Sequence, residues 1–142
     1  MATTFVTTRR VEFSDTDAAG IAHFSAFFRM MEQAEHELLR SVGLSVHSAA
    51  DQIGWPRVNA KCDFQSAARF EDLLEIEVRI ARLGKTSVTY SHRFLRSGEQ
   101  LAIGEITAVC CRIREGKPPK PITIPAAMVK KLRPFVADTI VK

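Results

Sequence analysis

Two aspartates separated by one residue, Asp15 and Asp17, precede a glycine and a long apolar segment. Asp favours turns and bonds to nearby backbone N–H groups, while Gly20 supplies freedom for a sharp turn or a close approach to a ligand. A helix beginning after such a turn presents unpaired N–H groups and a partial positive charge. That end can polarise a carbonyl oxygen while a carboxylate attacks the carbon. The alternative is that both aspartates only shape the turn and the helix start, where Asp is common.

The stretch from Glu12 to Ile21, EFSDTDAAGI, resembles the signature of the hot-dog-fold acyl-CoA thioesterases. The branch is typified by 4-hydroxybenzoyl-CoA thioesterase and by the short-chain acyl-CoA thioesterases encoded beside the Tol-Pal system. Its pattern is roughly aromatic-x-D-x-D-x-x-G-apolar, followed by the central helix, and a weaker resemblance extends over almost the whole chain. The resemblance implies that Asp17 is the catalytic carboxylate. Asp17 would act either as a nucleophile that forms a mixed anhydride or as a base that activates water, and the sequence leaves both routes open.

The resemblance also assigns neighbours of this carboxylate to the site. Gly20 and the backbone N–H of Phe24 correspond to the region that polarises the carbonyl, although Gly20 also suits a plain turn. His23 could contact the thioester or help to hold Asp17. A histidine with only a structural role is an equal alternative at that position.

Other acidic residues are expected to have lesser roles. Asp15 is predicted to stabilise the turn. Glu32 and Glu35, farther along the helix, are interpreted as solvated or interface charges, with Glu32 the better second candidate for a catalytic carboxylate. The chain departs from the family at Ala26 and Phe27, where relatives often have Asn-Tyr. Two hydrogen-bonding groups are thereby lost close to the site, which affects the expected choice of substrate.

A basic turn farther along the chain matches the loop where relatives hold the phosphates of coenzyme A. It contains Arg82, Lys85, Thr86 and Ser87. Lys offers a point charge and Arg a planar fork, and both suit phosphates. The alternative is an ordinary polar hairpin. The family implies no metal and no cofactor, because coenzyme A arrives as part of the substrate.

The composition is that of an ordinary soluble globular protein, with 142 residues, 46% hydrophobic residues and 25% charged residues. A net charge of +4 would suit an anionic ligand but is far from the signature of a nucleic-acid-binding protein. The cysteines Cys62, Cys110 and Cys111 lack metal-binding spacing and are expected to be buried thiols in a reducing compartment. No signal peptide or membrane span is recognised, so the predicted location is the cytoplasm.

Hydrophobic periodicity predicts the elements that must position these residues. Apolar residues three and four apart predict a helix from Phe24 to Val42, with Gly43 as its stop. The residues of its apolar face are Phe24, Phe27, Phe28, Met31, Ala34, Leu38 and Val42. Alternating patterns predict strands over residues 4–14, 55–64, 74–83, 86–96 and 100–114. The apolar phase of the last strand slips near Gly104 and Glu105, which suggests a bulge. A short helix is predicted from Pro125 to about Leu132, because Pro is tolerated in the first turn of a helix.

The order β–α–β–β–β–β fits an α+β architecture in which a five-stranded antiparallel sheet wraps around one long helix, the hot-dog fold. We expect one domain over residues 1–142. Open sheet edges favour pairing with a second copy, and the resemblance implies a homodimer with the second strands side by side, or a dimer of dimers. Two other functions are left open. One is a non-catalytic dimer that binds acyl-CoA or acyl carrier, and the other is a thioesterase acting on acyl-carrier protein.

Overall fold

The computed structural model describes residues 2–137 of the chain. The predicted domain spans residues 1–142, and its residue 1 and residues 138–142 lie outside the described residues. The main sheet is antiparallel throughout and its strand order is β1-β4-β5-β6-β3. Its strands are β1 (Phe5–Arg10), β3 (Arg57–Phe64), β4 (Leu73–Leu83), β5 (Ser87–Arg96) and β6 (Glu99–Val109). The α+β hot-dog arrangement expected from the sequence is confirmed.

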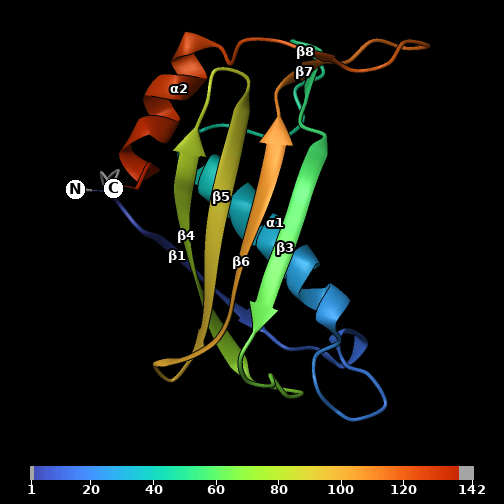
Figure 1. Ribbon diagram of the computed structural model, residues 1–142, viewed down its shortest axis with the longest axis vertical. Helices are drawn as coiled ribbons and strands as arrows, with labels where there is room; N and C mark the ends of the chain where they lie inside the picture. Colours follow the sequence, from blue (N-terminus) through green and yellow to red (C-terminus); the bar gives the residue numbers. More distant parts are fainter. Residues whose placement is uncertain (1, 138–142) are drawn as a thin grey trace.

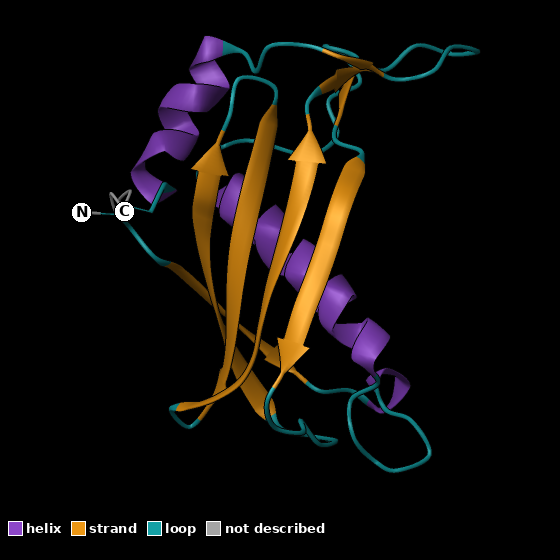
Figure 2. Ribbon diagram, in the orientation of Figure 1, coloured by secondary structure: helices purple, strands orange, loops and turns teal. Residues whose placement is uncertain are grey.

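The long helix α1 (Phe24–Ser41) crosses one face of this sheet, as Figure 2 shows. Its buried stripe consists of Ala26, Phe27, Met30, Met31, Ala34, Glu35, Leu38 and Leu39. These positions recur with helical period, so one side of the helix packs on the sheet. The helix ends at Ser41 with Val42 as its C-cap, and Gly43 follows with φ +77°, the left-handed conformation expected at a helix stop.

Smaller elements close the ends of the sheet (Figure 1). A second sheet has the order β2-β7-β8, with β2 (Ile53–Gly54), β7 (Cys111–Arg112) and β8 (Lys120–Pro121). Helix α2 (Ala126–Leu132) follows Pro125, as predicted, and leads into the short 3-10 turn η2 (Arg133–Phe135). Another 3-10 turn, η1 (Phe13–Asp15), lies between β1 and α1.

The strand faces follow the predicted alternation in the middle of the sheet. In β5, four residues at alternate positions are all buried: Val88, Tyr90, His92 and Phe94. The turn between β4 and β5 is tight, with the Gly84 N–H donating to the Ser87 carbonyl at 2.8 Å. The strands β4 and β5 are therefore joined as a tight hairpin.

Three details of the strands differ from prediction. The first strand, predicted over residues 4–14, ends at Arg10; beyond it, Val11 is buried, whereas Phe13 is 77% exposed. The turn η1 breaks the alternation there. Strand β6 ends at Val109 rather than at residue 114, and its irregularity does not lie at Gly104.

The irregularity of β6 lies at Leu101, where the pairing with β5 shifts by one residue. Gly104 is in phase with the buried positions and packs against Met31 of α1. A Cβ atom on Gly104 would stand 2.7 Å from the Met31 Cε and 2.9 Å from the Lys61 carbonyl oxygen. The glycine therefore permits close packing of helix on sheet, and the slip in apolar phase begins three residues earlier.

The helix also differs from prediction in its polar and apolar faces. Phe24, assigned to the apolar face, is 62% exposed. Glu35 is 1% exposed, whereas Glu32 is exposed, so the interpretation of Glu35 as a solvated or interface charge was wrong. Arg57 of β3 donates to the Glu35 carboxylate at 2.7 Å and supplies the partner that a buried charge requires. Burial raises the pKa of Glu35, while the Arg57 guanidinium opposes this shift.

Candidate active site

A cavity of about 330 Å³ opens beside the N-terminus of α1. It brings together the predicted residues Asp17, His23 and Phe24. The other lining residues are Ile21, Ala22, Phe27, Phe64, Ser66 and Ala67. The cavity combines one carboxylate, one imidazole and one hydroxyl with a largely apolar wall, the usual composition of a small-molecule site.

Asp17 lies at the base of a short closed loop. Thr16 and Ala22 form an isolated bridge, the Asp17 N–H donates to the Ile21 carbonyl at 2.9 Å, and the Gly20 N–H donates to the Asp17 carbonyl at 3.0 Å. Gly20 has φ +79°, which a residue with a side chain rarely adopts. The predicted turn glycine is therefore required by the backbone.

The carboxylate of Asp17 is exposed and only partly engaged. Its Oδ1 accepts the Ala19 N–H at 2.8 Å, as in an Asx turn. The other oxygen makes no hydrogen bond with the described residues. One oxygen therefore orients the carboxylate, and the other is left without a partner among the described residues.

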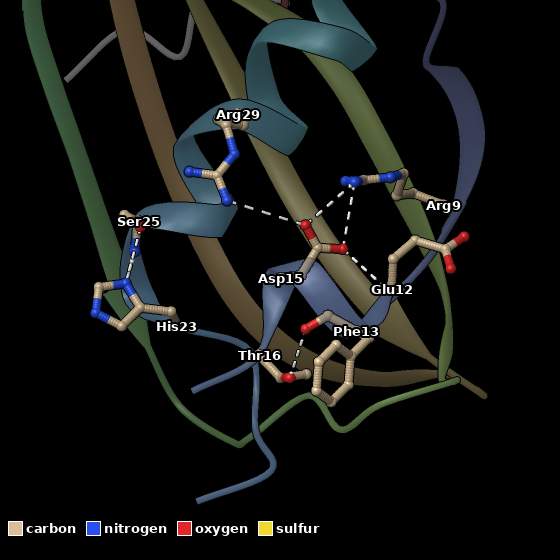
Figure 3. Close-up of polar contacts among 8 residues, drawn as sticks. All are labelled: Arg9, Glu12, Phe13, Asp15, Thr16, His23, Ser25 and Arg29. Atoms are coloured by element: carbon tan, nitrogen blue, oxygen red, sulfur yellow. Dashed lines mark hydrogen bonds and ion pairs between the residues drawn. The ribbon is translucent and has the colours of Figure 1, made fainter. Parts of the chain in front are cut away.

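The start of α1 presents one backbone N–H without a partner in the described part of the chain. The N-cap residue is His23, whose Nδ1 accepts the Ser25 N–H at 3.2 Å and lies 2.8 Å from the Ser25 Oγ (Figure 3). The Ala26 N–H donates to the His23 carbonyl. The Phe24 N–H, by contrast, has no acceptor within residues 2–137. A free N–H at a helix N-terminus is suited to a developing negative charge on oxygen.

The geometry of His23 also indicates its tautomer. Because Nδ1 accepts a backbone N–H, the proton of the neutral ring lies on Nε2. The ring of His23 stands 4.5 Å from that of Phe24, centroid to centroid. The structure thus gives His23 a capping role, and the direct catalytic role remains a prediction.

The segment after β3 forms the opposite wall. The Ala22 N–H donates to the Ala68 carbonyl at 2.7 Å, and Ile21 bridges Arg69. Arg96 of β5 donates to the Ala67 carbonyl at 3.0 Å and to Asp72 at 2.7 Å. These contacts hold the two loops of the cavity together.

The floor of the cavity is aromatic. The Phe27 ring packs edge-on against Phe64 and Phe94, with centroids 5.2 and 5.1 Å apart. Ala26 and Phe27, which replace the family's Asn-Tyr, are both buried. Phe27 lines the cavity and leaves this part of its wall apolar, whereas Ala26 does not line the cavity. Phe64 is 47% exposed, so the cavity is open on one side.

Sequence reasoning missed Phe64, Ser66 and Ala67 as lining residues. They reach the cavity because β3 pairs with β6 and the chain then folds back on the loop of Asp17. No spacing in the sequence records that return. Glu32, the second candidate for a catalytic carboxylate, lies instead beside Arg57 at a separate cavity of about 280 Å³.

The predicted phosphate-binding residues are not brought to this cavity. Arg82, Lys85, Thr86 and Ser87 lie at the β4–β5 turn, at the end of the sheet away from the start of α1 (Figure 1). Within one chain they are separate from Asp17, and their role remains a prediction. Among the described residues, no group of three or more His, Cys, Asp or Glu side chains could hold a metal ion. No helix in this part of the chain is both long enough and apolar enough to cross a membrane.

Comparison with known proteins identifies the family. The model of the thioesterase-like superfamily matches residues 11–132. The chain belongs to this superfamily. The match includes the loop of Asp17, all of α1 and every strand of the main sheet except β1.

Similar proteins agree with this assignment. The thioesterase is 32% identical over 111 residues to a 1,4-dihydroxy-2-naphthoyl-CoA hydrolase of Synechococcus, covering 72% of each chain. It is 27% identical to the acyl-CoA thioester hydrolase YbgC of Escherichia coli, covering 77% of this chain and 83% of that protein. The solved structure of a 1,4-dihydroxy-2-naphthoyl-CoA thioesterase from Synechocystis matches with a TM-score of 0.84 and 25% identity, covering 92% of this chain and 96% of the other.

Proposed function

We propose that this thioesterase hydrolyses an acyl-CoA to the free acid and coenzyme A, with Asp17 as nucleophile or general base. The supporting observation is that one cavity is lined by Asp17, which has one carboxylate oxygen free of hydrogen bonds, and by Phe24, which has a free backbone N–H. A thioester carbonyl placed between them would meet a hydrogen-bond donor at its oxygen and a carboxylate at its carbon.

Both routes use the same groups. In the nucleophilic route, Asp17 bonds to the carbonyl carbon, the C–S bond breaks and water then cleaves the anhydride. In the general-base route, Asp17 takes a proton from water, whose oxygen bonds to the carbon as the thiolate leaves. The thiolate is a good leaving group and takes up a proton. Neither route requires a metal or redox cofactor, and coenzyme A enters only with the substrate.

A homodimer, or a dimer of dimers, would complete the site. The strand β3 is an open edge of the sheet, and Val58 on β3 is 61% exposed. Pairing of two copies along β3 would cover this edge and the open side of the cavity at Phe64. Arg82 and Lys85 would then contact the phosphates of coenzyme A from a neighbouring subunit. We keep the cytoplasm as the proposed location, and three free thiols support a reducing compartment.

A second candidate is a dimer that binds acyl-CoA or acyl carrier without catalysis. The apolar residues Ala26 and Phe27 favour it, because fewer polar groups remain near the cavity to orient a reacting carbonyl. Hydrolysis of acyl-carrier protein is a further variant of the main proposal.

The test is release of free thiol from a panel of short, long and aromatic acyl-CoAs and from an acylated carrier protein. We expect turnover with at least one acyl-CoA, and the preferred substrate names the acyl class. If only the acylated carrier protein is hydrolysed, the substrate is an acyl-carrier protein and not an acyl-CoA. Binding without turnover of any substrate would contradict the enzymatic proposal and favour the binding dimer.

A further inference from the structure

Asp15 is a buried carboxylate next to the candidate site. It has no role in the proposed chemistry. It is 3% exposed and does not line the cavity. Its two oxygens accept hydrogen bonds from the Arg9 Nη2 at 3.3 and 3.2 Å, and Oδ2 also accepts the Glu12 N–H at 2.8 Å. The Arg29 Nη2 lies 4.0 Å from Oδ1. Figure 3 shows these groups converging on Asp15 from β1, η1 and α1.

The backbone of Asp15 connects it to the helix start. Its carbonyl accepts the His23 N–H at 2.8 Å, and the next residue, Thr16, bridges Ala22. The loop that carries Asp17 therefore begins directly after Asp15, and its end at His23 is hydrogen-bonded to the Asp15 carbonyl. Because His23 caps α1, this one hydrogen bond also ties the position of Phe24 to Asp15.

The charges around Asp15 make this connection depend on its carboxylate. Arg9 is only 25% exposed, its Nη1 is buried, and Nη1 has no hydrogen-bond partner among the described residues. Within these residues, Asp15 is the acidic partner of both Arg9 and Arg29. Without the carboxylate, two guanidinium groups would face each other without compensation, which favours a rearrangement of the turn.

We propose that Asp15 is a positioning residue that sets the Phe24 N–H relative to the Asp17 carboxylate. This inference rests on the proposed function, in which that N–H polarises the thioester carbonyl. Misplacement of reacting groups by about 1 Å can cost about 100-fold in rate. A link of Asp15 to β1 and α1 therefore matters to catalysis even though Asp15 does not touch the substrate.

The test measures the carbonyl directly, in an enzyme that cannot hydrolyse its substrate. In Asp17→Asn, the infrared stretch of bound benzoyl-CoA, labelled with heavy carbon at the thioester carbonyl, should shift to lower frequency than in water. Acetyl-CoA serves as the probe if the enzyme does not bind aromatic substrates. In the double variant Asp15→Asn/Asp17→Asn, we expect at least half of that shift to be lost at saturating ligand. In Asp15→Asn alone, kcat per folded protein should fall by at least about tenfold.

The matched control is Glu35→Gln, which also breaks an Arg–carboxylate pair of comparable exposure but lies farther along α1 and does not line the cavity. It should lower the melting temperature without changing the carbonyl shift. If Asp15→Asn does not fold, Arg9→Gln breaks the same link from β1 and should also reduce the shift when combined with Asp17→Asn.

The outcomes separate the two proposals. If Asp17→Asn alone produces no shift, polarisation by the helix is wrong and the proposed mechanism fails. If Asp17→Asn shifts the carbonyl and the double variant shifts it equally, Asp15 is only structural and the positioning role is overturned. An unchanged shift in Arg9→Gln has the same meaning.

Discussion

At the scale of single residues, the candidate site is defined by two groups that the fold leaves free, Asp17 Oδ2 and the Phe24 N–H. Their neighbours in the loop are bonded to one another. The resemblance to the family signature predicts Asp17, Gly20, His23 and Phe24, because these residues belong to one contiguous stretch that can be matched position by position. Ser66 could not be predicted, because it enters the cavity through the register of β3 with β6.

The capping contact of His23 gives a prediction that separates its structural role from a chemical one. His23→Asn keeps a side-chain acceptor at the N-cap, whereas His23→Ala removes it and should cost about 1 kcal/mol of folding free energy. We expect His23→Asn to retain the wild-type melting temperature within a few degrees and most of kcat. Thermal unfolding and thiol release measure both. If both variants lose kcat equally while His23→Asn stays stable, the imidazole itself takes part in the chemistry.

At the scale of elements, the contact of α1 with β6 depends on Gly104. Because a Cβ atom there would collide with Met31 and with the Lys61 carbonyl, Gly104→Ala should lower the free energy of unfolding by roughly 1–3 kcal/mol. Urea unfolding measures the loss. In a Met31→Ala background, Gly104→Ala should cost less free energy of unfolding than it does in wild type, because the collision with the Met31 side chain is removed. A Gly104→Ala protein as stable as wild type would show that the helix can move away from the sheet without cost.

The buried His92 of β5 predicts how stability depends on pH. It is fully buried, and neither ring nitrogen makes a hydrogen bond of good geometry with the described residues. Burial lowers the pKa of His92 from 6.5 to about 3. Since the unfolded chain takes up a proton below its pKa of 6.5 and the folded chain does not, stability should fall as the pH decreases from 6.5 towards 3.

The measurement is urea unfolding at about pH 7 and about pH 5, where the loss from one such histidine is of order 1–2 kcal/mol. In His92→Leu the difference between the two pH values should shrink by about that amount. The control His47→Leu, at an exposed position, should leave the difference unchanged. An equal pH dependence in wild type and His92→Leu would contradict the assignment.

Periodicity predicts these elements well where a strand or helix has one buried face. The alternation in β4 and β5 and the helical stripe of α1 follow from that geometry. The shift at Leu101 and the burial of Glu35 could not be read from the pattern. The first depends on pairing between β5 and β6, and the second on Arg57, which reaches Glu35 from β3.

At the scale of the whole molecule, the open edge at β3 predicts a dimer. Wild type should have twice the mass of the 15.8 kDa chain in light scattering, or four times that mass if it forms a dimer of dimers. Val58→Lys places a charge on the exposed edge and should favour the monomer, with lower activity because the cavity then stays open. Val6→Lys, on the opposite edge strand β1, should leave the dimer intact. A monomeric wild type, or dissociation by Val6→Lys alone, would contradict pairing along β3.

The most direct test of the account is the effect of Asp17→Asn on turnover and on substrate binding, measured with the preferred acyl-CoA. Asp51→Asn is the control, because Asp51 is also an exposed Asp with a local turn contact, to the Ser48 hydroxyl. We predict that Asp17→Asn lowers kcat by at least about 100-fold, since it removes the reacting carboxylate, while the substrate dissociation constant stays within about threefold. Asp51→Asn should match wild type in both. Full turnover in a folded Asp17→Asn protein would contradict the account and place the chemistry on another residue, with Glu32 the next to test.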